Sequence, residues 1–225
     1  MNARAPFFVF AGIFLLALLL PRPAGAAWPT DPLVNVPLCS VGNNQQYPTI
    51  VSDGAGGAII TWQDYRSGIW DIYAQRISAA GLLRWVTDGV ALCTAYAHQF
   101  SPAITPDVAG GAIVAWQDYR SGYLGYTDIY AQRISAAGVV QWAANGVALC
   151  MATGNQVCST TTSDAAGGAI VAWQDFRSGT NDDIYAQRVC AWGNSATVRE
   201  RESLPKRRSP SRSTPCARIP RAAVR

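Results

Sequence analysis

The feature that most constrains the fold of this chain is an internal repeat. A block of seventeen residues, SDGAGGAIITWQDYRSG in its first copy, recurs without a gap. Each copy continues, after a variable insert, into DIYAQR, and the first two copies end on GVALC at 89–93 and 146–150. Repetition on this scale indicates that each copy is one structural unit. The three blocks are 52–68, 106–122 and 163–179.

Each copy has the pattern of four short antiparallel strands. In the first copy a strand at 48–52 precedes an Asp and several glycines, which form a hairpin loop because Gly adopts the positive φ that such loops need. The next strand, 57–64, carries Ile60 and Trp62 on one face and Ile59 on the other, so both of its faces are apolar and it should be sandwiched. The third strand is DIYAQRI, and the fourth runs through Trp85 to Cys93.

Sheets that bury both faces against their neighbours are typical of β-propeller blades. We therefore predict an all-β fold of four-stranded antiparallel blade repeats at about 47–100, 101–157 and 158–193. An N-terminal strand at 28–39 (WPTDPLVNVPLC) matches the end of a repeat and should complete the last blade. Because propellers close with about four to eight blades, three blades predict a partial, open or truncated propeller.

The motifs GAIVAWQD-[YF]-RSG, DIYAQR and GVALC resemble repeats found in secreted bacterial multi-repeat proteins with propeller-like folds. The resemblance covers roughly residues 28–193. It implies the fold, and it implies no single activity, because such repeats occur on proteins of many roles.

The first 26 residues have the pattern of a secretory signal peptide. Arg4 gives a positive start, 7–20 is an apolar run, and Ala24-Gly25-Ala26 forms a small-residue cleavage site. The run is shorter than the ~20 apolar residues of a membrane-spanning helix, although an uncleaved anchor is the alternative. We expect the mature chain to be secreted or periplasmic, with no membrane attachment after cleavage.

Charge separates the body of the chain from its C-terminal tail. Residues 27–193 contain seven Arg and twelve Asp with no Lys or Glu, a net charge of −5, whereas 194–225 contain eight Arg and Lys206 against two Glu. The basic balance of the whole chain is therefore no evidence for nucleic-acid binding, and we expect none. The tail should be unpacked, either as a disordered basic arm or as an out-of-frame remnant of a gene with more blades.

A polar loop, Gln-Asp-[Tyr/Phe]-Arg-Ser-Gly, follows the second strand of every copy. Its presence in every blade favours a structural role, with the Asp capping an Asx-type turn and the Arg paired with a carboxylate such as Asp71. The alternative is a quasi-symmetric rim that binds sugars or polyanions. The candidate ligand-binding residues of this loop are Asp64, Arg66, Asp118, Arg120, Asp175 and Arg177.

The inserts after this loop differ between copies, as ligand-contacting loops do. They are 69–70, 123–127 and 180–182, and they include aromatic residues. Trp70, Tyr123 and Tyr126 are therefore further ligand-binding candidates.

The sequence offers no evident catalytic set. One His (His98) and one Lys exclude a His-based zinc cluster and a phosphate-binding loop within the body. A Glu acid/base of the sialidase kind is absent from 27–193, although two Asp could act as the paired carboxylates of a glycosidase. We expect no enzyme and no cofactor, with calcium at Asp53 or at 182–183 as an alternative.

Three cysteines, Cys39, Cys93 and Cys150, occupy equivalent positions and should be buried small hydrophobic residues, with a Cys150–Cys158 disulfide as the alternative.

The function we predict is an exported binding or scaffold module for a carbohydrate or cell-surface polymer. The alternatives are a carbohydrate-active propeller, sialidase-like or otherwise glycoside-processing, truncated by a frameshift, and a non-functional fragment. Since three blades do not close, two chains should associate to complete the ring.

Overall fold

The computed structural model describes residues 28–121 and 125–193, which form eleven strands in three antiparallel sheets. The first sheet contains β1 (Gln45–Ser52), β2 (Ala58–Asp64), β3 (Asp71–Ile77) and β4 (Val90–Cys93). The second contains β5 (Gln99–Pro106), β6 (Ala112–Asp118), β7 (Asp128–Ile134) and β8 (Val147–Cys150). The third contains β9 (Gln156–Ser163), β10 (Ala169–Asp175) and β11 (Asp183–Val189). Within these residues no helix is long and apolar enough to cross a membrane.

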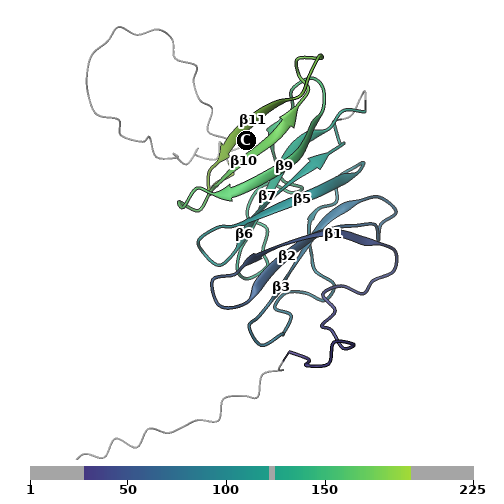
Figure 1. Ribbon diagram of the computed structural model, residues 1–225, viewed down its shortest axis with the longest axis vertical. Coiled ribbons are helices and arrows are strands. Elements are labelled where there is room, and N and C mark those ends of the chain that lie inside the picture. Colours follow the sequence, from purple (N-terminus) through teal and green to yellow (C-terminus); the bar gives the residue numbers. More distant parts are fainter. Residues whose placement is uncertain (1–27, 122–124, 194–225) are drawn as a thin grey trace, which may run out of the picture.

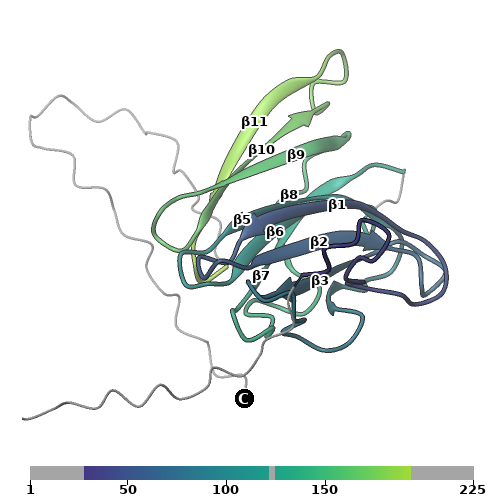
Figure 2. The same cartoon turned by 60° about the horizontal axis from the view of Figure 1, so that its bottom comes forward.

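The three sheets stack as blades of an open fan, in sequence order (Figure 1). Figure 2 shows the blades edge on, with the third blade splayed at one end of the stack. The first strands of the three blades, β1, β5 and β9, contact one another in order. The prediction of a partial, three-bladed propeller architecture is confirmed.

The repeated motifs adopt the same register in every blade. Trp62 of β2 lies opposite Tyr73 of β3, and the corresponding Trp and Tyr are opposite each other in the second and third sheets. The first strand of each blade contains a β-bulge at a residue with positive φ: Tyr47, Ser101 or Cys158. Equal sequence thus gives an equal backbone path, including its irregularities.

The core lies between the blades, and the first and second sheets each bury both faces. Ile59 and Ile72 of the first blade pack against Val114 and Trp116 of the second. Ile60 and Trp62, on the other face of the first blade, pack against the N-terminal segment 36–39. The alternation predicted for the second strand is therefore confirmed.

Two strand predictions are wrong. The fourth strand is shorter than expected, since only its last four residues pair with the third strand, in β4 and β8. The N-terminal segment 28–39 is not a strand. It packs on a face of the first blade, where it cannot pair with the edge of a sheet. The third blade, which has three described strands, is at the opposite end of the fan. The disulfide alternative is wrong as well, because Cys150 and Cys158 are free thiols.

Candidate ligand-binding rim

All of the described ligand-binding candidates lie at one rim of the fan. Antiparallel order places the ends of the second and fourth strands and the starts of the first and third strands at this edge. We call this edge the loop rim. It is formed by 65–70, 119–121, 125–127 and 176–182, and by the blade-to-blade connections 94–98 and 151–155.

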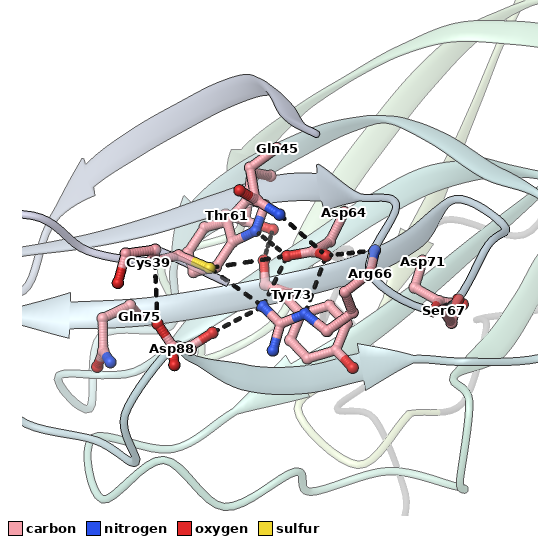
Figure 3. Close-up of polar contacts among 12 residues, drawn as sticks. Cys39, Gln45, Thr61, Asp64, Arg66, Ser67, Asp71, Tyr73, Gln75 and Asp88 are labelled. Atoms are coloured by element: carbon pink, nitrogen blue, oxygen red, sulfur yellow. Dashed lines mark hydrogen bonds and ion pairs between the residues drawn. The ribbon is translucent and has the colours of Figure 1, made fainter. Parts of the chain in front are cut away.

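Asp64 is the centre of a buried polar cluster at the loop rim of the first blade (Figure 3). Its carboxylate accepts hydrogen bonds from Trp62 Nε1 at 2.8 Å, from the backbone N–H of Arg66 at 2.9 Å and from Arg66 Nη2 at 2.6 Å. Burial by itself raises the pKa of Asp64, but the hydrogen bonds from Arg66 and Trp62 outweigh it and hold that pKa below its usual range. The carboxylate is therefore an ionised, fully used acceptor.

Arg66 joins separate segments of the chain through one guanidinium (Figure 3). Its Cζ lies 3.8 Å from the centre of the Tyr73 ring, and its Nη2 donates to Cys39 Sγ at 3.3 Å and to the carbonyl oxygen of Asp88 at 2.8 Å. The cluster recurs around Asp118, Arg120 and Tyr130 of the second blade with Cys93 of β4, and around Asp175, Arg177 and Tyr185 of the third blade with Cys150 of β8.

These clusters explain why the Asp-Arg loop recurs. The predicted Asx-type turn is present, since the backbone N–H of Arg66 donates to Asp64 Oδ1. The predicted partner of the arginine is different: Arg66 pairs with Asp64, two residues earlier, and not with Asp71. Asp64, Asp118 and Asp175 are each 0% exposed, so they position the loop and offer no surface to a ligand.

Asp71 lies beneath the rim with one unpartnered oxygen. Ser67 Oγ donates to Asp71 Oδ2 at 2.7 Å, while the buried Oδ1 has no hydrogen-bond partner. Burial raises the pKa of Asp71, and it likewise raises the pKa of the equivalent Asp128. Because Asp71 is 1% exposed, it cannot touch a ligand in this arrangement.

An aromatic cluster spans the loop rim between the first and second blades. The ring of Trp70 lies 4.9 Å from Tyr65 and 6.4 Å from Phe100, between ring centres. The ring centre of Phe100 also lies 5.5 Å from that of His98 and, in a T-shaped arrangement, 5.6 Å from that of Tyr119. All five residues are half-buried, so each keeps part of its surface accessible to solvent. We call these residues the rim aromatic cluster.

Backbone contacts between the blades hold Trp70 in place. The backbone N–H of Trp70 donates to His98 Nδ1 at 3.1 Å, and the N–H of Gln99 donates to the carbonyl oxygen of Trp70 at 2.7 Å. Since Nδ1 accepts this bond, neutral His98 carries its proton on Nε2. The backbone of Trp70 is thus fixed by contacts with the neighbouring blade.

The rim aromatic cluster breaks the repeat symmetry. The junction between the second and third blades keeps the backbone contacts, with Thr127 bonded to Asn155 and Gln156. It lacks the corresponding rings, because Thr127, Asn155 and Val157 stand where the first junction has Trp70, His98 and Phe100. The repeated Asp-Arg clusters stabilise the fold. Trp70, His98 and Phe100 occur at the first junction and not at the second, so they are available to bind a specific ligand.

Of the insert residues predicted as candidates, the structure places Trp70 in the rim aromatic cluster and leaves Tyr126 40% exposed at the same rim. Tyr123 lies outside the described residues. The sequence-based candidates did not include Phe100, Tyr65, Tyr119 or His98. The difference between copies at position 100 was the available signal.

Asp53, at the opposite rim, was the calcium alternative. Its carboxylate accepts hydrogen bonds from Arg76 and from the N–H groups of Ala55 and Gly57. Within 28–121 and 125–193, no three His, Cys, Asp or Glu side chains are grouped so that they could hold a metal ion.

The stacked antiparallel blades and their repeated clusters define a β-propeller-type repeat protein. No family model and no curated protein matches the sequence. Among solved structures, the chain is similar to an endo-arabinase from Bacteroides thetaiotaomicron, with a TM-score of 0.41 and 16% sequence identity. The match covers 69% of this chain and 60% of that protein, so the chain spans about three fifths of the length of its neighbour.

This comparison corrects one prediction. We expected a chain with no enzymatic activity, whereas the structure that the chain resembles belongs to an enzyme. The expectation of a non-enzyme is therefore not carried further. A likeness of this degree assigns neither a substrate nor catalytic residues to this chain.

Proposed function

We propose that this protein is a carbohydrate-active propeller that binds a glycan chain at the rim aromatic cluster. The observation that carries the proposal is the clustering of Tyr65, Trp70, Phe100 and Tyr119, with His98, across one blade junction. Rigid, half-exposed rings with a few polar groups are what a sugar ring needs, since its apolar face stacks on the rings while its hydroxyls find donors and acceptors.

The polar groups beside the rings supply the orientation. Tyr65 and Tyr119 each carry a phenolic hydroxyl that both donates and accepts. His98 adds a donor, because its Nδ1 is occupied by the Trp70 N–H and its proton is on Nε2. These groups suit neighbouring hydroxyls of a pyranose or furanose ring.

The charge of the body favours a neutral glycan over a polyanion. Residues 27–193 carry seven Arg and twelve Asp, a net charge of −5. Three of these arginines, Arg66, Arg120 and Arg177, are already paired with aspartates at the loop rim. A uronic-acid polymer would meet an acidic body with its rim arginines engaged, so neutral polysaccharides are the expected ligands.

The test is affinity electrophoresis of the full chain in gels that contain neutral or acidic polysaccharides, with release of reducing ends measured on the same panel. At least one neutral polymer should retard the protein. The substitutions Trp70→Thr and Phe100→Val place at the first junction the residues found at the second, Thr127 and Val157. Each should weaken binding about tenfold or more, as loss of an aromatic anchor does, without changing the melting temperature by more than about 2 °C.

The matched control is Leu82→Val, which copies Val139 of the second blade in the exposed turn at the opposite rim. It should leave binding unchanged. Retention that survives Trp70→Thr and Phe100→Val together, or no retention by any neutral polymer, would remove the proposal. Reducing-end release that is lost in Trp70→Thr would show that the rim also serves a glycosidase.

We also propose that the protein is exported. The support is the sequence pattern of residues 1–26, which lie outside the described residues, as does the basic tail 194–225. Expression from the full gene followed by N-terminal sequencing of the exported fraction tests this directly. A first residue near Ala27 is expected, and a chain that keeps Met1 inside the cell would contradict it.

A further inference from the structure

We propose that a second copy of this chain covers the open face of the third blade with its own N-terminal segment and first blade, so that two chains close one ring of blades. This inference is independent of the glycan site. It concerns the two ends of the fan, which lie at opposite ends of the stack in Figure 1.

The third blade exposes a face that the other blades bury. Ile170 of β10 is 43% exposed and Ile184 of β11 is 75% exposed. Their equivalents in the first and second blades are all 0% exposed: Ile59 and Ile113 for Ile170, and Ile72 and Ile129 for Ile184. Two large apolar side chains whose equivalents are buried between blades therefore face solvent in the third blade.

The first two blades show what covers the equivalent faces. In the first blade, Ile59 and Ile72 pack against Val114 and Trp116, which belong to the next copy of the repeat. In the second blade, Ile129 packs against Val171 and Trp173 of the following copy. The cover is in both cases the Trp-bearing face of a repeat of the same sequence.

One Trp-bearing face is left at the start of the fan. Ile60 and Trp62 of the first blade correspond to Val114 and Trp116, and the segment 36–39 lies over them. Beside this segment is an open cavity of about 260 Å³, lined by Leu38, Gln46, Pro48, Ile60 and Trp62. Ile50 is 65% exposed here, whereas its equivalent Ile104 packs into the core between blades.

The N-terminal segment already sits as the last strand of a preceding blade would. Cys39 accepts a hydrogen bond from Arg66 Nη2 at 3.3 Å, and Cys93, at the end of β4, accepts the same bond from Arg120 at 2.9 Å. Ser40 and Thr94 also repeat each other, since their N–H groups donate to the side chains of Asp88 and Asn145. The segment 36–39 is therefore placed like Val90–Cys93, but it pairs with no strand among the described residues.

The sheet that needs such a strand is the third, where β11 is the outer described strand. In the first blade Cys93 lies opposite Ile72, and Val90 lies opposite Ala74. The same register places Cys39 of a second copy opposite Ile184, and Val36 of that copy opposite Ala186. Strand addition would complete the third blade and bury Ile170 and Ile184 at once.

Two copies can satisfy each other. The contact is between different surfaces, the third blade of one chain and the first blade of the other, and such contacts either close into rings or extend as filaments. The described residues of one chain form three blades, so those of two chains give six, within the range of about four to eight in which propellers close. A twofold ring is therefore the expected assembly.

The first test is the mass of the full chain in solution, by light scattering after size exclusion at about 50 µM protein. We expect a mass twice that of one chain, which is 24.0 kDa when residues 1–26 are included. Ile184→Asp should raise the dimer dissociation constant at least tenfold, and the monomer should stay folded, because this side chain is 75% exposed in a single chain. Val139→Asp, at a residue 56% exposed in a turn away from both ends, is the matched control and should leave the dimer intact.

The second test is a cross-link. Directly opposed strand residues lie within disulfide range, so Ile184→Cys should bond to Cys39 of the other copy under mild oxidation. Peptide mapping should find this pair, and Cys39→Ser should abolish it. The proposal would be overturned if the chain were a monomer at this concentration, or if it formed an open series of larger oligomers. It would also be overturned if the dimer resisted Ile184→Asp, or if oxidation did not produce the 39–184 pair.

Discussion

Arg120 Nη2 lies 2.9 Å from Cys93 Sγ, and this contact joins the second blade to the last strand of the first. The same guanidinium bonds Asp118 at 2.5 Å and lies 4.0 Å from the centre of the Tyr130 ring. One guanidinium thus contacts a buried carboxylate and a ring of its own blade and a cysteine of the preceding blade. The motif that recurs most often in this sequence fastens one blade to the next.

Arg120→Gln should destabilise the fold strongly, because it leaves the 0% exposed carboxylate of Asp118 without its ionic partner. Removing one partner of a buried pair costs about 3–5 kcal/mol. Urea unfolding measures this loss. Arg84→Gln, at an exposed arginine, is the control and should change stability by less than about 0.5 kcal/mol. A loss below about 1 kcal/mol for Arg120→Gln would mean that the cluster contributes little.

Stability should fall in acid. Burial by itself raises the pKa of Asp53, Asp64, Asp164 and Asp175, but hydrogen bonds from arginines and backbone N–H groups outweigh it and hold all four pKa values below the usual 3.8. A carboxyl whose folded pKa is lowered stabilises the fold above its unfolded pKa and loses that contribution as pH falls through the folded value. Urea unfolding should therefore show decreasing stability below about pH 4.

Two single variants should respond to pH with opposite signs. The pKa of Asp175 is lowered, so Asp175→Asn should be most destabilising at pH 7 and less so at pH 2.5. Burial raises the pKa of Asp71, so its ionisation opposes folding as pH rises, and Asp71→Asn should gain stability relative to the unmodified chain between pH 3 and pH 7. If the change in unfolding free energy relative to the unmodified chain varied with pH in the same way for both variants, these assignments would be contradicted.

Gly146→Ala should disrupt the packing of the second blade. At φ +88°, a Cβ there would lie 2.7 Å from the Ala131 carbonyl oxygen and 2.7 Å from Trp116 Cη2. The steric cost adds to that of a left-handed residue, so we expect a loss above about 2 kcal/mol in thermal or urea unfolding. Gly54→Ala shares the positive φ, at +74°, but has open space, and it should cost only about 1 kcal/mol. Similar losses for both would show that packing against Trp116 is not limiting.

Local periodicity was enough to predict the blades. Alternation of apolar residues on both faces of 58–64 places Ile59 and Trp62 on opposite sides of the sheet, and the structure has them there. Glycines and Asp53 mark the hairpin, and the Asx turn at Asp64 follows from neighbouring residues. These features depend on residues a few positions apart, which is why the sequence by itself determined them.

The stacking of the blades determined the rim aromatic cluster, the partner of Arg66 and the conformation of the N-terminal segment. Trp70 and Phe100 belong to different blades and meet because the first strands of these blades, β1 and β5, lie side by side, a contact that no periodicity within one copy indicates. Arg66 pairs with Asp64 because Tyr73, Cys39 and Asp88 close around its guanidinium. The segment 28–39 carries the sequence of a strand end yet forms none, since a strand needs the edge of a neighbouring sheet, and only the tertiary structure decides whether that edge is within reach.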